Sequence, residues 1–169
     1  MCTNDTTSSA ALPKTMHAAV FVPGHGLLYF VGGFDNINHT NPTTSICALT
    51  VDGESFNLQA QKKLKLGVSR AALTATLLPK NVVLYAGGVT RSNAGTLANS
   101  NTFEVMFEYL SEDNKVMIDL SSPAAMLEGR LDHSAVTTCD GRALIVGGIQ
   151  YVGNQLGALE TSELFNPQP

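Results

Sequence analysis

Short apolar runs separated by tight turns make up most of the chain, and none has the length or period of a helix. Two of them, residues 17–22 and 27–31, are joined by Pro-Gly-His-Gly, a pattern that predicts a β-hairpin. Because both runs are continuously apolar, they indicate strands covered on both faces. Two further runs, 45–51 and 55–58, flank Asp52-Gly53, which is typical of a turn. We therefore expect four short antiparallel strands here.

The same plan recurs twice along the chain. In each unit the second apolar run ends in a glycine pair, and the pairs recur after 55 and 60 residues (88 − 33 and 148 − 88). The later runs are 70–78, 82–86, 103–109, 116–120, 133–138, 142–146 and 161–165. A repeat of this length indicates one supersecondary unit stacked several times. The third unit ends in Pro167 and Pro169 before a fourth strand can form.

The glycine pairs have a structural explanation. Glycine lets the chain leave a strand at backbone angles that a Cβ forbids, and it lets neighbouring units approach closely. We therefore expect structural roles for Gly32, Gly33, Gly87, Gly88, Gly147 and Gly148.

A longer phrase surrounds each pair, and the third unit carries it most fully. Arg130 precedes His133-Ser134, the next strand ends in the glycine pair, and Glu163 and Phe165 follow on the third strand. In this phrase the sequence resembles the kelch repeat of kelch-type and galactose-oxidase-like β-propellers. The tryptophan that the family carries on its fourth strand is absent, because the chain has none.

The other units keep parts of the phrase. The second has Arg70 and Glu104 with Leu73 in place of histidine, and the first has His17 with Lys14 in place of arginine. The resemblance implies an all-β fold of three kelch-type four-stranded antiparallel blades forming a partial β-propeller. The expected boundaries are a polar segment 1–13 and blades at 14–61, 62–121 and 122–169, the last lacking its fourth strand.

The cations and acids of the phrase are expected to bond to one another. A buried guanidinium must be paired, so Arg70 and Arg130 are predicted to bond to backbone or to structural glutamates within their blades, with Glu104 and Glu163 in that role. A ligand role for the two arginines is the alternative.

Three blades do not close a ring, because propellers have four to eight. Two completions are open: the chain is a fragment of a longer propeller, or it forms a homo-oligomer in which two three-blade arcs make six. In the second case Thr3 to Leu12 would supply the missing strand of the partner's third blade.

Long connections between the second and third strands of each blade are the expected binding surface, together with the connections between blades. Binding groups usually lie on loops held by a rigid scaffold. The candidate residues are Asn36, Asn38, His39, Arg70, Arg91, Asn93, Arg130, Gln150, Tyr151 and Asn154. They predict a non-catalytic module that recognises a protein or a glycan. The alternative, which the resemblance implies, is a galactose-oxidase-like or sialic-acid-modifying enzyme; we assign no catalytic residue, metal or cofactor.

Composition and charge limit the classes of partner that we expect. The formal charge is −4, so the chain has no basic footprint for nucleic acid, and no apolar stretch is long enough to cross a membrane. Three cysteines, an odd number without metal-type spacing, do not indicate a disulfide framework. Cys2 before a polar stretch resembles a bacterial lipoprotein start, which would place the chain outside the cytoplasm; a cytoplasmic location is the alternative.

Overall fold

The computed structural model describes residues 15–52, 55–59, 64–92, 94–153 and 155–167. The first sheet, blade 1, consists of four antiparallel strands in sequence order. They are β1 (Ala18–Val22), β2 (Leu27–Val31), β3 (Ile46–Asp52) and β4 (Ser55–Gln59).

Blades 2 and 3 repeat this topology. Blade 2 contains β5 (Thr74–Leu78), β6 (Val82–Ala86), β9 (Thr102–Leu110) and β10 (Val116–Leu120), with a 3-10 turn η1 (Pro79–Asn81) and a short β11 (Ala124–Ala125) paired to β9. Blade 3 contains β12 (Ser134–Thr137), β13 (Ala143–Val146) and β16 (Ser162–Phe165), and no fourth strand occurs among its described residues. The predicted all-β class is confirmed.

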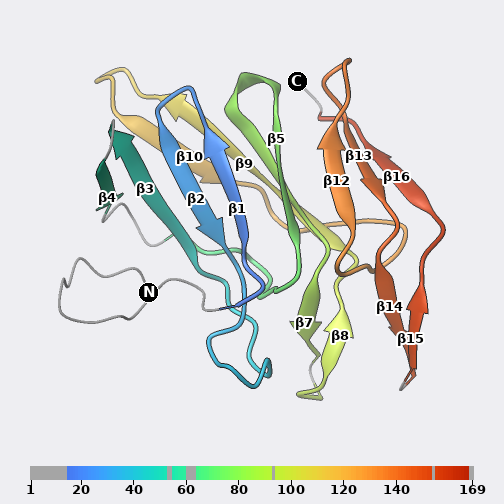
Figure 1. Ribbon diagram of the computed structural model, residues 1–169. Helices are drawn as coiled ribbons and strands as arrows, with labels where there is room; N and C mark the ends of the chain where they lie inside the picture. Colours follow the sequence, from blue (N-terminus) through green and yellow to red (C-terminus); the bar gives the residue numbers. More distant parts are fainter. Residues whose placement is uncertain (1–14, 53–54, 60–63, 93, 154, 168–169) are drawn as a thin grey trace.

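The blades stand side by side in an open arc, with β1, β5 and β12 adjacent (Figure 1). Two apolar clusters fill the junctions, a junction being the interface between neighbouring blades. Tyr29 and Val31 of blade 1 pack with Tyr85 of blade 2 in the first cluster. In the second, Leu84 of blade 2 packs with Ile145 of blade 3. Burial of these side chains on both faces of blade 2 is the main stabilising term.

The strands differ in how many of their two faces are buried. All five residues of β6 are buried, because blade 2 has a neighbour on each side. β1 instead alternates between buried and exposed residues, with Ala19 and Phe21 exposed, so only one of its faces is covered. The prediction of two covered faces, made for residues 17–22 and 27–31, was therefore wrong for β1, and β2 alternates between buried and half-buried residues.

Glycine is required at two junctions because the next blade's backbone lies against it. A Cβ on Gly32 would stand 2.4 Å from the carbonyl oxygen of Arg70, and a Cβ on Gly87 would stand 2.4 Å from that of Arg130. Both glycines have positive φ. The following glycines donate N–H groups to the same two carbonyls, at 2.9 Å and 2.7 Å. Each pair thus joins its own blade to the next.

A second backbone link runs just before the first strand of each blade. Met16, Ala72 and Asp132 occupy the same repeat position and all have positive φ, at 53°, 53° and 50°. Ala72 donates its N–H to Met16 at 2.8 Å, and Asp132 donates to Ala72 at 3.2 Å. This relay of left-handed residues, uncommon for non-glycine side chains, ties each blade to the one before it.

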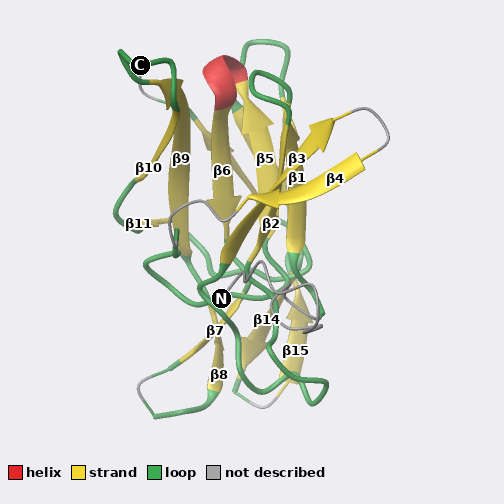
Figure 2. Ribbon diagram, turned by 90° about the vertical axis from the view of Figure 1, so that its left-hand side faces the viewer, coloured by secondary structure: helices red, strands yellow, loops and turns green. Residues whose placement is uncertain are grey.

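Two of the three connections expected to be loops are hairpins. β7 (Val89–Arg91) pairs with β8 (Leu97–Asn99), and β14 (Ile149–Val152) pairs with β15 (Gln155–Ala158). The first connection, 34–44, is irregular. All three project from one end of the arc, opposite the tight turns between first and second strands (Figures 1 and 2). We call this the loop end.

Cys47 on β3 is buried and disulfide-bonded, so the cysteine count underestimated cross-linking, whereas Cys139 is free and exposed. The lipoprotein-like Cys2 and the strand exchange by Thr3 to Leu12 concern a segment outside the described residues. Within those residues, no helix has the length and hydrophobicity needed to span a membrane.

Candidate binding surface at the loop end

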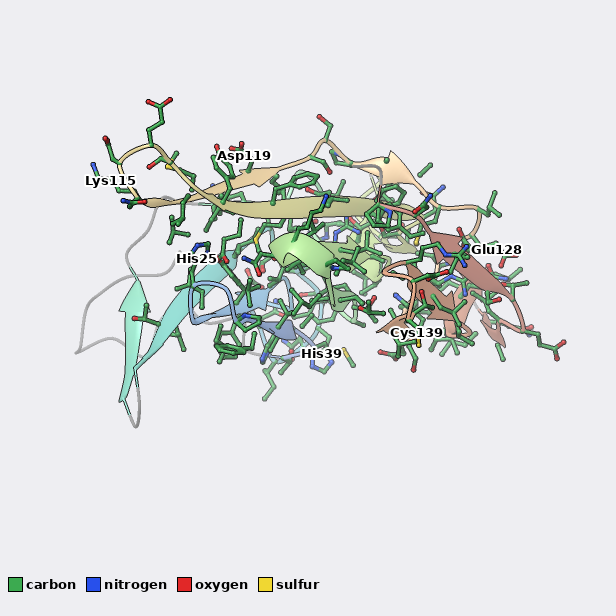
Figure 3. All side chains as sticks on the ribbon, turned by 90° about the horizontal axis from the view of Figure 1, so that it is seen from above. His25, His39, Lys115, Asp119, Glu128 and Cys139 are labelled. Carbon is green, nitrogen blue, oxygen red and sulfur yellow. The ribbon has the colours of Figure 1, made fainter. Side chains whose placement is uncertain are left out.

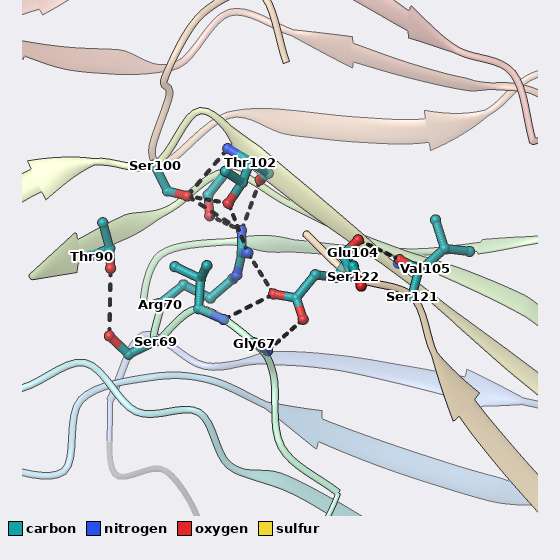
Figure 4. Close-up of polar contacts among 12 residues, drawn as sticks. Gly67, Ser69, Arg70, Thr90, Ser100, Thr102, Glu104, Val105, Ser121 and Ser122 are labelled. Atoms are coloured by element: carbon teal, nitrogen blue, oxygen red, sulfur yellow. Dashed lines mark hydrogen bonds and ion pairs between the residues drawn. The ribbon is translucent and has the colours of Figure 1, made fainter. Parts of the chain in front are cut away.

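Arg70 is fully buried and bonds to its own blade. Its Nη1 donates to the carbonyl oxygens of Gly87 (3.0 Å) and Thr102 (2.8 Å), and its Nη2 donates to Glu104 Oε1 (2.7 Å), as Figure 4 shows. Glu104 also accepts the N–H groups of Gly67 (2.6 Å) and Val68 (3.3 Å). Burial lowers the pKa of Arg70, against the opposing effect of the Glu104 carboxylate. Arg70 and Glu104 thus form a bonded arginine–glutamate pair within blade 2, which we call a clamp.

Arg130 forms the equivalent clamp in blade 3. It donates to the carbonyl oxygens of Gly147 (2.6 Å) and Thr161 (3.2 Å) and to Glu163 Oε1 (3.1 Å). Glu163 in turn accepts the N–H groups of Leu127 and Glu128, at 2.8 Å and 3.2 Å. Because both guanidinium groups are buried and bonded to the protein, we assign Arg70 and Arg130 to the scaffold rather than to the binding surface.

Blade 1 departs from this pattern on its third strand. Ser45 takes the place of Thr102 and Thr161, since the carbonyl of each accepts the N–H of the first glycine of its blade's pair. Two residues further on, where the other blades carry the clamping glutamate, blade 1 has Cys47. With Lys14 at the arginine position, the sequence of blade 1 contains no arginine–glutamate pair there.

The first connection is held by its own side chains. Asn36 accepts the N–H of Thr40 at 3.1 Å and donates its amide to the Thr40 hydroxyl at 2.8 Å. The ring of His39 lies 5.2 Å from that of Phe34, which is buried below it. Asn38 and His39 are exposed. Of the three candidates here, Asn36 therefore maintains the loop, and the other two face solvent.

The two hairpins present one repeat position to solvent. Arg91 and Tyr151 each lie three residues after a glycine pair, and both are exposed. Arg91 stands opposite Leu97 on its hairpin, and Tyr151 stands opposite Leu156. Gln150 is half-buried. The remaining candidates, Asn93 and Asn154, lie outside the described residues.

Asn99 joins the two hairpins, a role that the sequence did not reveal. Its amide donates to the carbonyl of Tyr151 at 3.0 Å and accepts the Tyr151 N–H at 2.9 Å. Asn99 stands in the polar stretch Asn99-Ser-Asn101, which reads as a loop and carries no signal for a contact 52 residues away. Phe34 packs with Val89 and Leu97 beneath the surface. The three connections therefore form one continuous surface.

The histidines at equivalent positions have different surroundings. His133 is buried in a junction, where Nε2 lies 2.8 Å from the Thr74 hydroxyl and Nδ1 has no partner. Burial, with a smaller contribution from Arg130, lowers the pKa of His133 to about 4. His17 is exposed at the end of the arc, 5.5 Å from the ring of Phe30. Among the described residues, no group of three or more His, Cys, Asp or Glu is arranged to hold a metal ion.

A buried carboxylate outside the loop end joins blades 1 and 2. Glu108 on β9 accepts the hydroxyl of Tyr29 at 2.5 Å and lies 2.7 Å from Nδ1 of His25, which is labelled in Figure 3. Burial and the bond to Glu108 raise the pKa of Tyr29. His25 belongs to the turn before β2, so this group stabilises the first junction at the opposite end from the loops.

No family model and no curated protein matches this sequence. Solved structures do. One is described as the structure of YjhT, with a TM-score of 0.55 and 16% identity over 82% of this chain. Another is a fungal alcohol oxidase of the AA5 family in complex with copper, with a TM-score of 0.58 and 17% identity over 80% of this chain.

The chain therefore has the fold of a partial β-propeller with three blades. The likeness is one of fold, and it extends over 35% and 27% of the two solved chains, so this sequence spans about a third of their length. The sequence repeat and the sheets of the three blades together support a partial propeller with an ordered loop end.

Proposed function

We propose that this kelch-type arc is a non-catalytic binding module that recognises a partner through its loop end. The observation that carries the proposal is the shared position of Arg91 and Tyr151. Blade 2 has neighbours on both sides, yet Arg91 is exposed, so exposure at this position does not result from the open end of the arc. Asn99 holds the two hairpins together and so presents both side chains on a fixed support.

The chemistry of the surface favours a protein partner over a glycan. Ile37, Val152 and Leu156 are exposed on the same end, with exposed fractions of 83%, 62% and 58%. Aromatic residues and arginine are enriched in the buried centres of protein interfaces, where they supply most of the binding energy. An arginine and a tyrosine bordered by exposed aliphatic side chains match that composition.

Site-specific crosslinking tests this proposal. Photoreactive benzoylphenylalanine would replace Tyr151 in one variant and Tyr109 in another, and both would be expressed in the source cells. Tyr109 is the matched control because it is a tyrosine of similar exposure, 42% against 39%, near the turn at the opposite end of blade 2. We expect a discrete protein adduct from position 151 alone, and its loss in an added Arg91→Ala substitution, with Lys115→Ala as the charge control.

Two results would decide against a protein-binding loop end. Equal adducts from positions 151 and 109 would refute it, as would an adduct that persists after Arg91→Ala. Retention on a glycan array that Tyr151→Ala abolishes would make the partner a carbohydrate. Turnover in a screen of monosaccharides for oxidation or anomerisation, with and without added copper, would replace the non-catalytic proposal with the enzyme alternative, which at present rests on fold analogy.

A further inference from the structure

The free face of blade 3 repeats the surface that is buried in the other two blades. Val136 stands opposite Leu144, which stands opposite Leu164, and Val146 lies on the same side. In blades 1 and 2 the residues at these positions are all buried at a junction: Val20, Tyr29, Val31, Ala48, Thr76, Leu84, Ala86 and Val105. In blade 3 three of the four are exposed, Val136 at 56%, Val146 at 44% and Leu164 at 47%.

The free face of blade 1 repeats the complementary surface. Blade 3 packs against blade 2 with Ala135, Ala143, Ile145 and Phe165. The corresponding positions of blade 1 are Ala19, Leu28, Phe30 and Leu49, which are exposed or half-buried, and Phe21 beside them is 45% exposed. Neither set contains a charged residue. The arc therefore carries both halves of a junction, one at each end.

Backbone groups at the two ends are also complementary. At an internal junction the carbonyl of a left-handed residue accepts an N–H from the next blade, and the second glycine donates its own N–H. Among the described residues, the carbonyl of Asp132 and the N–H of Gly148 have no such partner at the blade 3 end. At the blade 1 end the N–H of Met16 is likewise without one. These are the groups that a further junction would pair.

The space around Gly147 also differs from that at the internal junctions. Like Gly32 and Gly87 it has positive φ, but among the described residues the atom nearest to a Cβ on Gly147 would be the Leu159 carbonyl oxygen, at 3.6 Å. The two internal glycines would clash at 2.4 Å. Gly147 thus leaves room where the next blade's backbone lies at the internal junctions.

We propose that two copies of this chain pair head to tail, the free face of blade 3 in each copy packing on the free face of blade 1 in the other. Each contact would reproduce an internal junction, with Met16 of the second copy donating to the Asp132 carbonyl. Propellers have four to eight blades, and six is the only multiple of three in that range. Two-fold closure is also the commonest symmetry of homo-oligomers.

The assembly does not rest on the proposed binding function, but it would complete that surface. Closing the ring brings the first connection of one copy, with Asn38 and His39, beside the β14–β15 hairpin of the other. At the internal junctions neighbouring connections already meet in this way, through Asn99 and Tyr151 and through Phe34 and Val89. Each loop-end surface would then contain residues of both copies.

Sedimentation equilibrium over a hundredfold range of protein concentration tests the proposal. We expect a mass of two chains, each of 17.9 kDa. Val146→Glu and Phe21→Glu place a charge on the two free faces and should each give a monomer at concentrations where the unaltered chain is a dimer. Leu110→Glu is the control, because Leu110 is 51% exposed at the end of β9, away from both faces. It should leave the dimer intact.

Mixing the variants distinguishes head-to-tail closure from other dimers. A mixed pair of Val146→Glu and Phe21→Glu has one junction carrying both changes and one junction carrying neither, so equimolar mixing should restore dimers that neither variant forms alone. A dimer made by two copies of one face would be insensitive to one of the substitutions and would show no rescue. Circular dichroism would show that both variants keep their β-structure.

Gly147→Ala supplies a second, independent test. It should weaken the dimer at least tenfold while lowering the melting temperature of the monomer no more than Gly153→Ala, since Gly153 has positive φ and nothing within 4 Å. A monomer at all concentrations would overturn the proposal and leave further blades of a longer polypeptide as the cover of these faces. Open-ended polymers, or no rescue on mixing, would overturn it as well.

Discussion

Replacing Arg70 by methionine should be among the most destabilising single substitutions in this chain. The change keeps an unbranched side chain but removes the donors to Gly87, Thr102 and Glu104. The Glu104 side chain has no exposed surface, so its carboxylate would remain buried with only two backbone N–H partners. Breaking a buried ion pair by removing one partner costs about 3–5 kcal/mol. For a domain of this size, that lowers the melting temperature by roughly 6–20 °C.

Urea unfolding followed by circular dichroism measures the loss, and Arg130→Met is the matched comparison. Arg130 makes the equivalent bonds and a further one to Glu128 Oε2 at 3.4 Å, but the Glu128 and Glu163 side chains are 39% and 13% exposed, so water can partly solvate the carboxylates left behind. We expect a smaller loss for Arg130→Met. The double variant Arg70→Met/Glu104→Met should lose less than the sum of its two single changes, because no buried charge remains. A loss below about 1 kcal/mol for Arg70→Met, or additive effects in the double variant, would refute the clamp.

Three further substitutions test other features. Gly87→Ala should destabilise the chain by more than Gly153→Ala. Both substitutions incur about 1–2 kcal/mol for left-handed backbone, but only the first places a Cβ 2.4 Å from a carbonyl oxygen. Paired urea unfolding curves of the two variants would measure the difference. Because the pKa of His133 is about 4 against an ordinary 6.5, the unfolded state takes up its proton first, so stability falls from pH 6.5 to pH 4 by about 3 kcal/mol. His133→Leu should flatten that part of a stability–pH profile; an unchanged profile would contradict the assignment. Asn99→Ala should cost under about 1 kcal/mol yet speed hydrogen exchange at the Tyr151 amide, and unchanged exchange would show that Asn99 does not join the hairpins.

The repeat made most of the fold predictable. Apolar runs and turn residues located the strands of all three sheets, because a short continuously apolar segment between turn signals has few other structures available to it. The hairpins β7–β8 and β14–β15 were not predicted, since Val89-Thr-Arg91 and Leu97-Ala-Asn99 are too short to show a period. Their pairing depends on Asn99 and on the cluster under Phe34, which are tertiary contacts that no local pattern encodes.

The candidate site was harder to predict than the scaffold. For Arg70 and Arg130 the sequence analysis expected bonds to Glu104 and Glu163, and the structure has both bonds. The sequence left a ligand role open as the alternative, because an arginine before a strand does not show how far its guanidinium is buried. The left-handed Met16, Ala72 and Asp132 were missed for a related reason. Methionine and alanine rarely adopt positive φ, so at Met16 and Ala72 the bonds between blades impose the conformation, whereas aspartate adopts it more readily at position 132.

The backbone bonds that link Met16, Ala72 and Asp132 all run in the same direction from blade to blade, which matters for engineering. Ala72 both accepts from one neighbour and donates to the other, so blade 2 carries a complete set of connectors. A tandem duplicate of this unit, inserted in frame, would find a matching connector on either side, whereas an inverted or truncated insert would not. The direction of these bonds therefore favours lengthening the arc by whole blades in the same orientation.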